Sequence, residues 1–172
     1  QALERLTTQG RGQVTLPGAW QVYGQGGSLV LAREPATPPP PLVPISLPAT
    51  ATGRQKVGDL VLIWQTLERP ELPEVLSTDP WQAWLDRDKL SLPLVVRGWQ
   101  PGDRFQPLGL PYRKKLQDFF VDAKIPRQQR GIIPLVVSGA EIVWVVGHRL
   151  AEPVKITSTT RRVLHFQALP GL

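Results

Sequence analysis

Three carboxylates are the first candidates for chemistry in this sequence: Asp103, Asp118 and Asp122 lie close together along the chain. Oxygen ligands of this kind bind magnesium, but Lys and Arg residues surround all three, so ion pairing explains them better. The two histidines, His148 and His165, are far apart, and the chain has no Cys. Neither a zinc site nor a thiol nucleophile is therefore expected. We assign no catalytic residue and no metal ligand.

A glycine-rich stretch, Gly24-Gln25-Gly26-Gly27-Ser28, has the composition of a phosphate-binding loop. Such a loop should lead into the N-terminus of a helix. Here it leads into Leu29–Ala32, which reads as a strand, so the sequence favours a hairpin turn.

Positive charge is the main functional signal. Residues 97–172 hold 12 Lys and Arg against 5 Asp and Glu, whereas residues 1–96 hold 8 against 9. The excess that gives the chain its net charge of +6 thus lies in the second half. A one-sided excess indicates a polyanionic partner. The alternative is an ordinary solvated basic face.

The densest segment runs from Arg97 to Arg130, with eight basic and three acidic residues. A helix is predicted over roughly Tyr112–Lys124, with Leu116, Phe119, Phe120 and Ala123 on one apolar face and Lys114 pointing away from it. Cations in the first turn of a helix oppose its dipole, which suggests that they meet phosphates instead. The candidate RNA-binding residues are Arg97, Arg104, Lys114, Lys115, Lys124, Arg127, Arg130 and Arg149.

Structural alternatives stand beside these assignments. Asp103 could orient Arg104 toward a phosphate, or Asp103 could cap a turn while Arg104 stacks on a core aromatic ring. Trp99 and Tyr112 could stack on bases, although core or interface positions suit them better. A structural role is also favoured for His148.

The arrangement of elements is expected to be mainly β with short helices, because 19 Pro break long helices. Residues 1–34 read as the end of a preceding domain or a β-hairpin extension, residues 35–48 as a Pro-rich linker, and residues 49–172 as the main domain. The expected strands are Gln13–Leu16, Trp20–Tyr23, Leu29–Ala32, Leu60–Trp64, Leu92–Arg97, Ile133–Val137, Ile142–Val146, Val154–Ile156 and Arg162–Phe166. Trp81–Leu85 fits either a helical turn or a strand.

No apolar run is long enough for a membrane span, and the N-terminus does not resemble a signal peptide. The chain begins with Gln1 and contains no Met. We therefore expect a piece of a longer protein, with further function upstream.

Several motifs of the second half together resemble one family. They are LVVR at Leu94–Arg97, PGDRFQPLG at Pro101–Gly109, KKLQDFFVDAKIP at Lys114–Pro126 and EIVWVVGHR at Glu141–Arg149, followed by Lys155, Thr157 and Thr160. In order and spacing they are similar to the C-terminal domain of tRNA(Ile)-lysidine synthetases. LPGAW at Leu16–Trp20 and LDRDKL at Leu85–Leu90 are similar more weakly. The sequence departs from the family in having Tyr112 where a Gly is common.

The resemblance implies a three-layer β-sandwich of unusual topology, shared with a domain of the phenylalanyl-tRNA synthetase β chain. It implies an ATP-dependent ligase that joins lysine to the wobble cytidine of tRNA(Ile), with residues 49–172 gripping the acceptor stem and body of the tRNA. That chemistry belongs to an N-terminal domain with an SGGxDS motif, which is absent from this sequence. The fragment alone is therefore expected to be inactive.

The resemblance further implies partners and surroundings. ATP and magnesium would serve the missing catalytic domain, and this fragment would hold no cofactor. The partners would be tRNA(Ile), the N-terminal domain and a second copy in a homodimer, in the cytoplasm and without a membrane. The rival interpretation is a non-catalytic structural or dimerisation scaffold of the same or a related tRNA enzyme.

Overall fold

The computed structural model describes residues 13–16, 20–25, 28–33, 40–69 and 76–171. The chain divides into two compact units, residues 1–39 and 40–172. In the first unit, β1 (Gln13–Leu16), β2 (Trp20–Gln25) and β3 (Ser28–Arg33) form an antiparallel sheet in that order. These strands confirm the three that the sequence predicts there.

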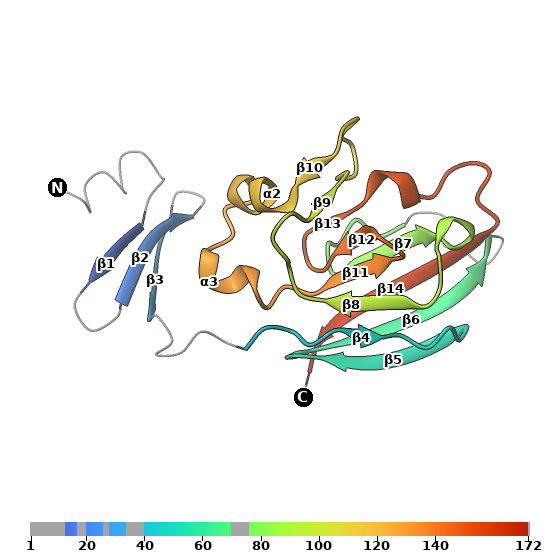
Figure 1. Cartoon of the computed structure of the whole chain (residues 1–172), viewed down its shortest axis with the longest axis horizontal. Helices are drawn as coiled ribbons and strands as arrows, with labels where there is room; N and C mark the ends of the chain where they lie inside the picture. The colour runs from blue at the N-terminus through green and yellow to red at the C-terminus, as the bar shows by residue number, and fades with distance from the viewer. Residues whose placement is uncertain (1–12, 17–19, 26–27, 34–39, 70–75, 172) are drawn as a thin grey trace. The chain divides into compact units, whose positions relative to one another are not determined.

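The second unit contains two larger sheets (Figure 1). A five-stranded sheet has the order β13-β12-β11-β8-β4, and a four-stranded sheet has the order β5-β6-β14-β7. The five-stranded sheet consists of β4 (Ile45–Ser46), β8 (Leu94–Arg97), β11 (Leu135–Ser138), β12 (Glu141–Val145) and β13 (Arg149–Leu150). The four-stranded sheet consists of β5 (Thr52–Val57), β6 (Leu60–Glu68), β7 (Gln82–Asp86) and β14 (Arg162–Pro170). All pairings within these sheets are antiparallel.

The remaining elements are short. A two-stranded ladder joins β9 (Arg104–Phe105) to β10 (Lys114–Lys115), and helix α2 (Leu116–Asp122) follows at once. Helix α3 (Arg127–Arg130) precedes β11, and the 3-10 helices η2 (Arg87–Lys89) and η3 (Glu152–Val154) follow β7 and β13. The mainly β prediction with short helices is confirmed.

The core lies on both faces of the five-stranded sheet. On one side, Trp144 of β12 packs against Phe166 of β14, with ring centroids 5.8 Å apart. All four residues of β11 and four of the five in β12 are buried, so neither face of these strands meets solvent. The segment of β9, β10 and α2 adds Phe105, Leu116 and Phe120 to the same core cluster. The layers are thus the four-stranded sheet, the five-stranded sheet and this segment.

The expected Pro-rich linker is partly built into the domain. Ile45 of β4 pairs with Val96 of β8, and Leu47 is 3% exposed in the main core. The second compact unit accordingly begins at Pro40. Residues 35–39 lie outside the described residues.

Two sequence predictions about local structure were wrong. Helix α2 begins at Leu116, because Lys114 and Lys115 pair with β9 in a short strand before it. The expected strand Val154–Ile156 does not form: Val154 ends the 3-10 helix η3, and Lys155 makes an isolated bridge with Leu85. The undecided stretch Trp81–Leu85 is the strand β7.

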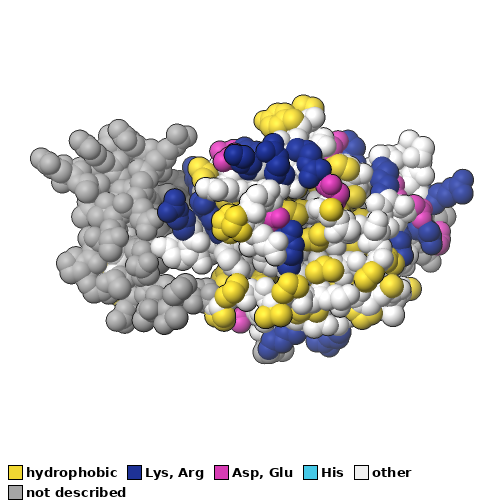
Figure 2. Space-filling model, in the orientation of Figure 1, with side chains coloured by type: hydrophobic (Ala, Val, Ile, Leu, Met, Phe, Trp, Pro, Cys, Tyr) yellow, Lys and Arg dark blue, Asp and Glu magenta, His cyan; other side chains and the backbone are white. Residues whose placement is uncertain are grey.

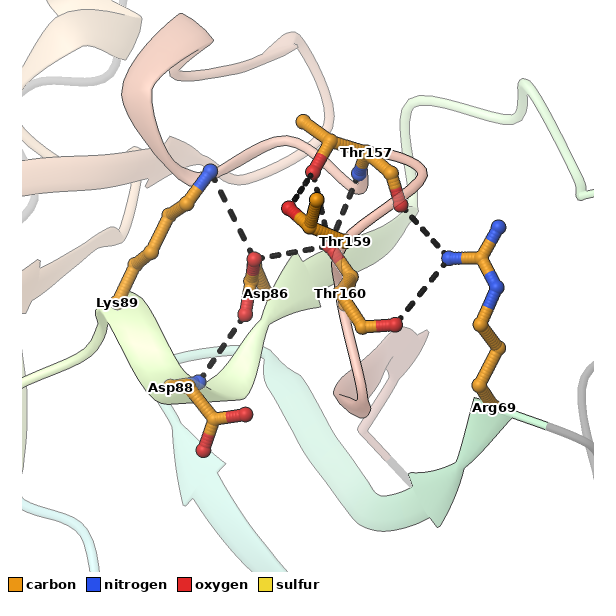
Figure 3. Close-up of polar contacts among 7 residues, drawn as sticks. All are labelled: Arg69, Asp86, Asp88, Lys89, Thr157, Thr159 and Thr160. Atoms are coloured by element: carbon orange, nitrogen blue, oxygen red, sulfur yellow. Dashed lines mark hydrogen bonds and ion pairs between the residues drawn. The ribbon is translucent and has the colours of Figure 1, made fainter.

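A buried carboxylate at the end of β7 fixes the loop that leads into β14 (Figure 3). Asp86 is 4% exposed, and its side chain accepts hydrogen bonds from Thr160 Oγ1 at 2.8 Å and from the backbone N–H of Asp88 at 3.2 Å. Lys89 Nζ lies 3.6 Å from the same carboxylate. Thr160 belongs to the loop that leads into β14, whereas Asp88 and Lys89 belong to the turn that follows β7. The Asp86 carboxylate therefore ties this loop to β7 by charge-assisted hydrogen bonds.

The same loop is held from its other side. Thr160 Oγ1 also accepts from the backbone N–H of Thr157 at 2.9 Å. Arg69, just after β6, donates to the carbonyl oxygens of Thr157 at 2.7 Å and Thr160 at 3.3 Å. The Thr160 hydroxyl is therefore the point at which the loop and the buried carboxylate meet.

Replacing Thr160 with Val should lower the free energy of unfolding by about 1–3 kcal/mol, since it leaves a buried carboxylate short of a donor at nearly constant shape. Urea unfolding measures the change. The matched control is Thr159→Val, because Thr159 is exposed and its hydroxyl bonds the nearby Thr157 hydroxyl, not the buried carboxylate. Equal losses in the two variants would contradict this account of the Asp86 network.

Candidate nucleic-acid interface

In the short antiparallel ladder of β9 and β10, successive side chains alternate between the core and solvent. This alternation decides which basic side chains are exposed. We call residues 104–115, which comprise β9, β10 and their connection, the basic hairpin. Phe105 is fully buried, so its neighbour Arg104 points to the opposite side and is exposed. Lys115 is the cross-strand partner of Arg104, and Lys114 that of Phe105. Arg104 and Lys115 therefore share the outer face of the basic hairpin.

Lys114 lies on the inner side, contrary to the prediction that it points into solvent. Its ammonium group donates a hydrogen bond to the carboxylate of Asp122 at the end of α2. That bond raises the pKa of Lys114, against the opposing effect of burial. Lys114 thus helps to fasten α2 to the basic hairpin, and its charge is balanced locally.

The charges of Arg104 and Lys115 on the outer face are not balanced in this way. Within the described part of the chain, no ion pair involves Arg104 or Lys115, while neighbouring cations do form ion pairs. Like charges directly opposite each other on a ladder destabilise it. A polyanion lying across the outer face would turn this repulsion into attraction, which makes Arg104 and Lys115 the centre of the candidate interface.

Arg97 has a different role in the structure from that of a free cation. It forms a two-pronged pair with Asp103, with Nη1 to Oδ2 at 2.8 Å and Nη2 to Oδ1 at 2.9 Å. Both side chains are largely buried, at 16% and 12% exposure. Asp103 also accepts from the backbone N–H of Gln100 at 2.9 Å. The pair therefore holds the Pro101-Gly102 turn in place, and Asp103 pairs with Arg97, not with Arg104.

Arg113 was absent from the predicted set, although it braces the basic hairpin. It donates to the Glu141 carboxylate at 2.9 Å and to the carbonyl oxygen of Arg104 at 3.3 Å. The first bond ties the hairpin to the start of β12, and the second ties its two strands together. No spacing in the sequence signals the contact with Glu141.

Lys124 occupies a backbone conformation that favours glycine. Its φ is 56°, just after the C-cap residue Ala123 of α2, and its side chain is exposed. The next residue, Ile125, donates its backbone N–H to Phe120 at 2.9 Å, so the turn closes the helix. A Lys at such a position costs stability, and a cost of this kind is often associated with function.

Arg127 and Arg130 come from the same short helix, α3. Arg127 is exposed, whereas Arg130 donates from Nε to the carbonyl oxygen of Ile125 at 3.0 Å and lies 5.9 Å from the ring centroid of Phe120. Burial lowers the pKa of Arg130, and the charge of Arg127 adds to this effect. Arg130 is thus partly a packing residue that presents the rest of its guanidinium group beside Arg127.

Arg149 lies on β13, exposed, and donates to the carbonyl oxygen of Leu108 at 3.2 Å. Leu108 belongs to the basic hairpin, so this bond connects Arg149 to it. Burial lowers the pKa of the neighbouring His148, which is therefore neutral at pH 7.

Of the two aromatic candidates, Trp99 packs against the core, as expected, whereas Tyr112 is 57% exposed in the basic hairpin.

In the described residues, then, the structure brings Arg104 and Lys115 together and sets Arg127 beside Arg130. Figure 2 shows a row of Lys and Arg side chains along the upper side of the second unit, with acidic side chains among them, and further Lys and Arg side chains at its right and lower sides. The same residues contain no group of three His, Asp or Glu side chains placed to hold a metal ion. They also include no helix long and apolar enough to cross a membrane.

Comparison with known sequences identifies relatives of one kind. The family model described as the TilS substrate C-terminal domain matches residues 94–166. The chain is 35% identical over 145 residues to a tRNA(Ile)-lysidine synthase of Geobacter sulfurreducens, covering 84% of this chain and 23% of that protein. It is 51% identical over 81 residues to one of Caldanaerobacter subterraneus, covering 47% of this chain and 17% of that protein. The chain thus spans about a fifth of the length of these relatives.

A solved structure has the same fold. The crystal structure of a TilS C-terminal domain superposes with a TM-score of 0.63 at 25% identity, covering 74% of this chain and 98% of that one. The basic hairpin lies within the region that the family model matches.

Replacing Lys124 with Gly should raise the free energy of unfolding, by up to about 1 kcal/mol, because glycine adopts positive φ without steric cost. The adjacent Ala123→Gly is the control: Ala123 has φ −75°, so glycine there should lower stability by roughly 0.5–1 kcal/mol. Chemical denaturation of both variants measures the difference. A loss of stability in Lys124→Gly would mean that the Lys124 side chain holds the fold.

Proposed function

Because residues 94–166 match the family model described as the TilS substrate C-terminal domain, we propose that this chain binds tRNA through the outer face of the basic hairpin. The observation that carries the proposal is the cross-strand pair of Arg104 and Lys115, two exposed cations side by side without a carboxylate partner in the described part of the chain. Such a pair is unfavourable in the free protein and suits the phosphates of an RNA backbone.

Further cations extend this surface. Lys124 and Arg127 are exposed after α2 and on α3, and Arg130 and Arg149 each keep part of a guanidinium group beside their structural bond. Arg97 and Lys114 act on the interface indirectly, since their partners Asp103 and Asp122 fix the turn and the helix on either side of it. Contacts with phosphates set position and orientation, and they do not read the sequence of the RNA.

The names of the relatives suggest a tRNA(Ile)-lysidine synthase as the whole protein. By the resemblance of the sequence motifs, it would be an ATP-dependent ligase that joins lysine to the wobble cytidine of tRNA(Ile). In this arrangement the present chain grips the acceptor stem and body of the tRNA in the cytoplasm. ATP, magnesium and recognition of the anticodon would belong to parts of the protein outside this chain. The relatives extend far beyond the region matched here, which leaves room for such parts.

Changing Arg104 and Lys115 together to Ala should weaken the binding of tRNA and make it less dependent on salt. With each lost phosphate contact, fewer counterions are released from the RNA on binding. The slope of the logarithm of affinity against the logarithm of salt concentration should therefore become shallower by about one to two. Filter binding or fluorescence anisotropy at several salt concentrations measures the slope. Most tRNAs should be affected alike.

The matched control is Arg54→Ala with Lys56→Ala. It removes the same two charges from exposed positions of β5 in the four-stranded sheet. The proposal predicts little change in the slope for this variant. If both double variants change it equally, net charge explains binding and the basic hairpin is not the interface. If the parent chain binds no tRNA, the scaffold interpretation takes its place.

The chain alone should form no lysidine, because it lacks the SGGxDS motif that the family uses with ATP. Incubation of residues 1–172 with tRNA(Ile), ATP, magnesium and radiolabelled lysine tests this. Label recovered in the tRNA above a no-protein control would contradict it.

A further inference from the structure

A pocket of about 630 Å³ lies between β7, β13 and the connection of the basic hairpin. We call it the Trp84 pocket, after one of its walls. Trp84, Leu108, Leu150 and Ile156 supply apolar surface, and Arg149 and Lys155 are the basic residues of its lining. Its volume is in the range typical of small-ligand sites. Of these residues, Arg149 also belongs to the interface proposed above, and Leu108 lies in the basic hairpin.

The aromatic wall is held rigidly. The Trp84 indole stacks on the His165 imidazole, with ring centroids 3.7 Å apart and an angle of 12° between the planes. His165 is itself fixed through Nε2, 3.1 Å from Gln82 Oε1. A ring that is fixed in this way loses little conformational freedom when a flat ligand packs against it. The pocket therefore offers a preorganised surface for a planar group.

Arg149 gives one part of the pocket a positive charge that suits an anion attached to that planar group. Arg149 and Lys155 are both exposed, and Arg149 has no ion-pair partner in the described part of the chain. Lys155 is paired with Glu152. Burial lowers the pKa of His148, so His148 adds no charge at pH 7. The carboxylate of Asp79, also in the lining, accepts a hydrogen bond from the backbone N–H of Trp81 at 3.0 Å and can accept from an amino or hydroxyl group of a ligand.

The pocket adjoins the basic hairpin through covalent and hydrogen-bonded links. Leu108 lies in the connection between β9 and β10, and its backbone N–H donates to Leu150 at 2.8 Å. Arg149 donates to the carbonyl oxygen of the same Leu108. One segment of chain thus carries both the Arg104–Lys115 pair and a wall of the pocket, so that a single RNA strand could contact both.

We propose that the Trp84 pocket binds an unpaired nucleotide of the bound RNA, with the base against the apolar wall and its phosphate at Arg149. This inference rests on the proposed function and adds a second subsite to it. Aromatic walls accept any base, because every base has a flat face. The subsite therefore distinguishes an unpaired end or loop from a duplex more than it distinguishes one base from another.

The test compares two RNA hairpins with the same duplex, one blunt and one with a short single-stranded 3′ overhang. The probe protein is the whole chain, with a pocket-filling variant, Thr78→Trp, and a control, Ser158→Trp. Thr78 is exposed and lines the pocket, whereas Ser158 is exposed on a loop and does not line it. Anisotropy titrations give the affinities, and circular dichroism verifies that both variants are folded.

The parent should bind the overhang RNA about tenfold more tightly than the blunt RNA, as expected for the stacking of one base. Thr78→Trp should abolish that advantage and leave the affinity for the blunt RNA unchanged, while Ser158→Trp should preserve both. Arg149→Ala should weaken the binding of the overhang RNA more than that of the blunt RNA.

Three outcomes would overturn the inference. If the parent binds both RNAs equally and Thr78→Trp changes nothing, the subsite is rejected and the proposed function stands. If the parent binds neither RNA, the proposed function fails and the subsite fails with it. In a third arm, CMP and AMP are titrated alone. Saturable binding of these mononucleotides that Thr78→Trp removes, without any overhang effect, would assign the pocket to a free nucleotide.

Discussion

The burial of Phe105 is the constraint on which the candidate interface depends. Its ring centroid lies 5.1 Å from that of Phe119, with an angle of 87° between the ring planes, and the side chain is fully buried. In a strand, neighbouring side chains point to opposite faces. Once Phe105 is committed to the core, Arg104 must face solvent, and the antiparallel register places Lys115 beside it. The stability of the core thus supports two cations that repel each other on its surface.

Asp103 connects this ladder to the rest of the domain. Its carboxylate is shared between Arg97 of β8 and the turn at Gln100, and its carbonyl oxygen accepts from the backbone N–H of Leu116 at 2.8 Å. One residue therefore fixes the end of a central strand, a tight turn and the first residue of α2. The Arg97–Asp103 pair is largely buried, and breaking such a pair by removing one partner is costly. The position of the basic hairpin is consequently set by charge as well as by packing.

The sequence was sufficient for the parts of the fold that depend on local pattern. The apolar runs at β8, β11 and β12, the three strands of the first unit and the mainly β class all follow from composition and spacing. It was insufficient where tertiary pairing overrides propensity. Lys114 and Lys115 fit a helical periodicity, but the register with β9 makes them a strand.

The same limit applied to individual cations. Spacing could not reveal that Asp103 pairs with Arg97, six residues away, while the adjacent Arg104 remains outside. Nor could it reveal the positive φ of Lys124 or the contact between Arg113 and Glu141.

These pairings change how the excess of positive charge should be understood. Arg97, Arg113, Lys114 and Arg162 all have carboxylate partners, so a large part of the basic composition belongs to the fold. The exposed cations without a carboxylate partner in the described residues include Arg104 and Lys115 on the outer face of the basic hairpin and the exposed positions that follow α2, besides Arg54 and Lys56 on β5. A concentrated field steers a polyanion to one edge, whereas a dispersed one would mainly confer solubility.

Because phosphates attract every RNA in the same way, discrimination between RNAs must come from shape and from unpaired bases. The Trp84 pocket, joined to the hairpin through Leu108, combines an aromatic wall with a cation, Arg149, that has no ion-pair partner among the described residues.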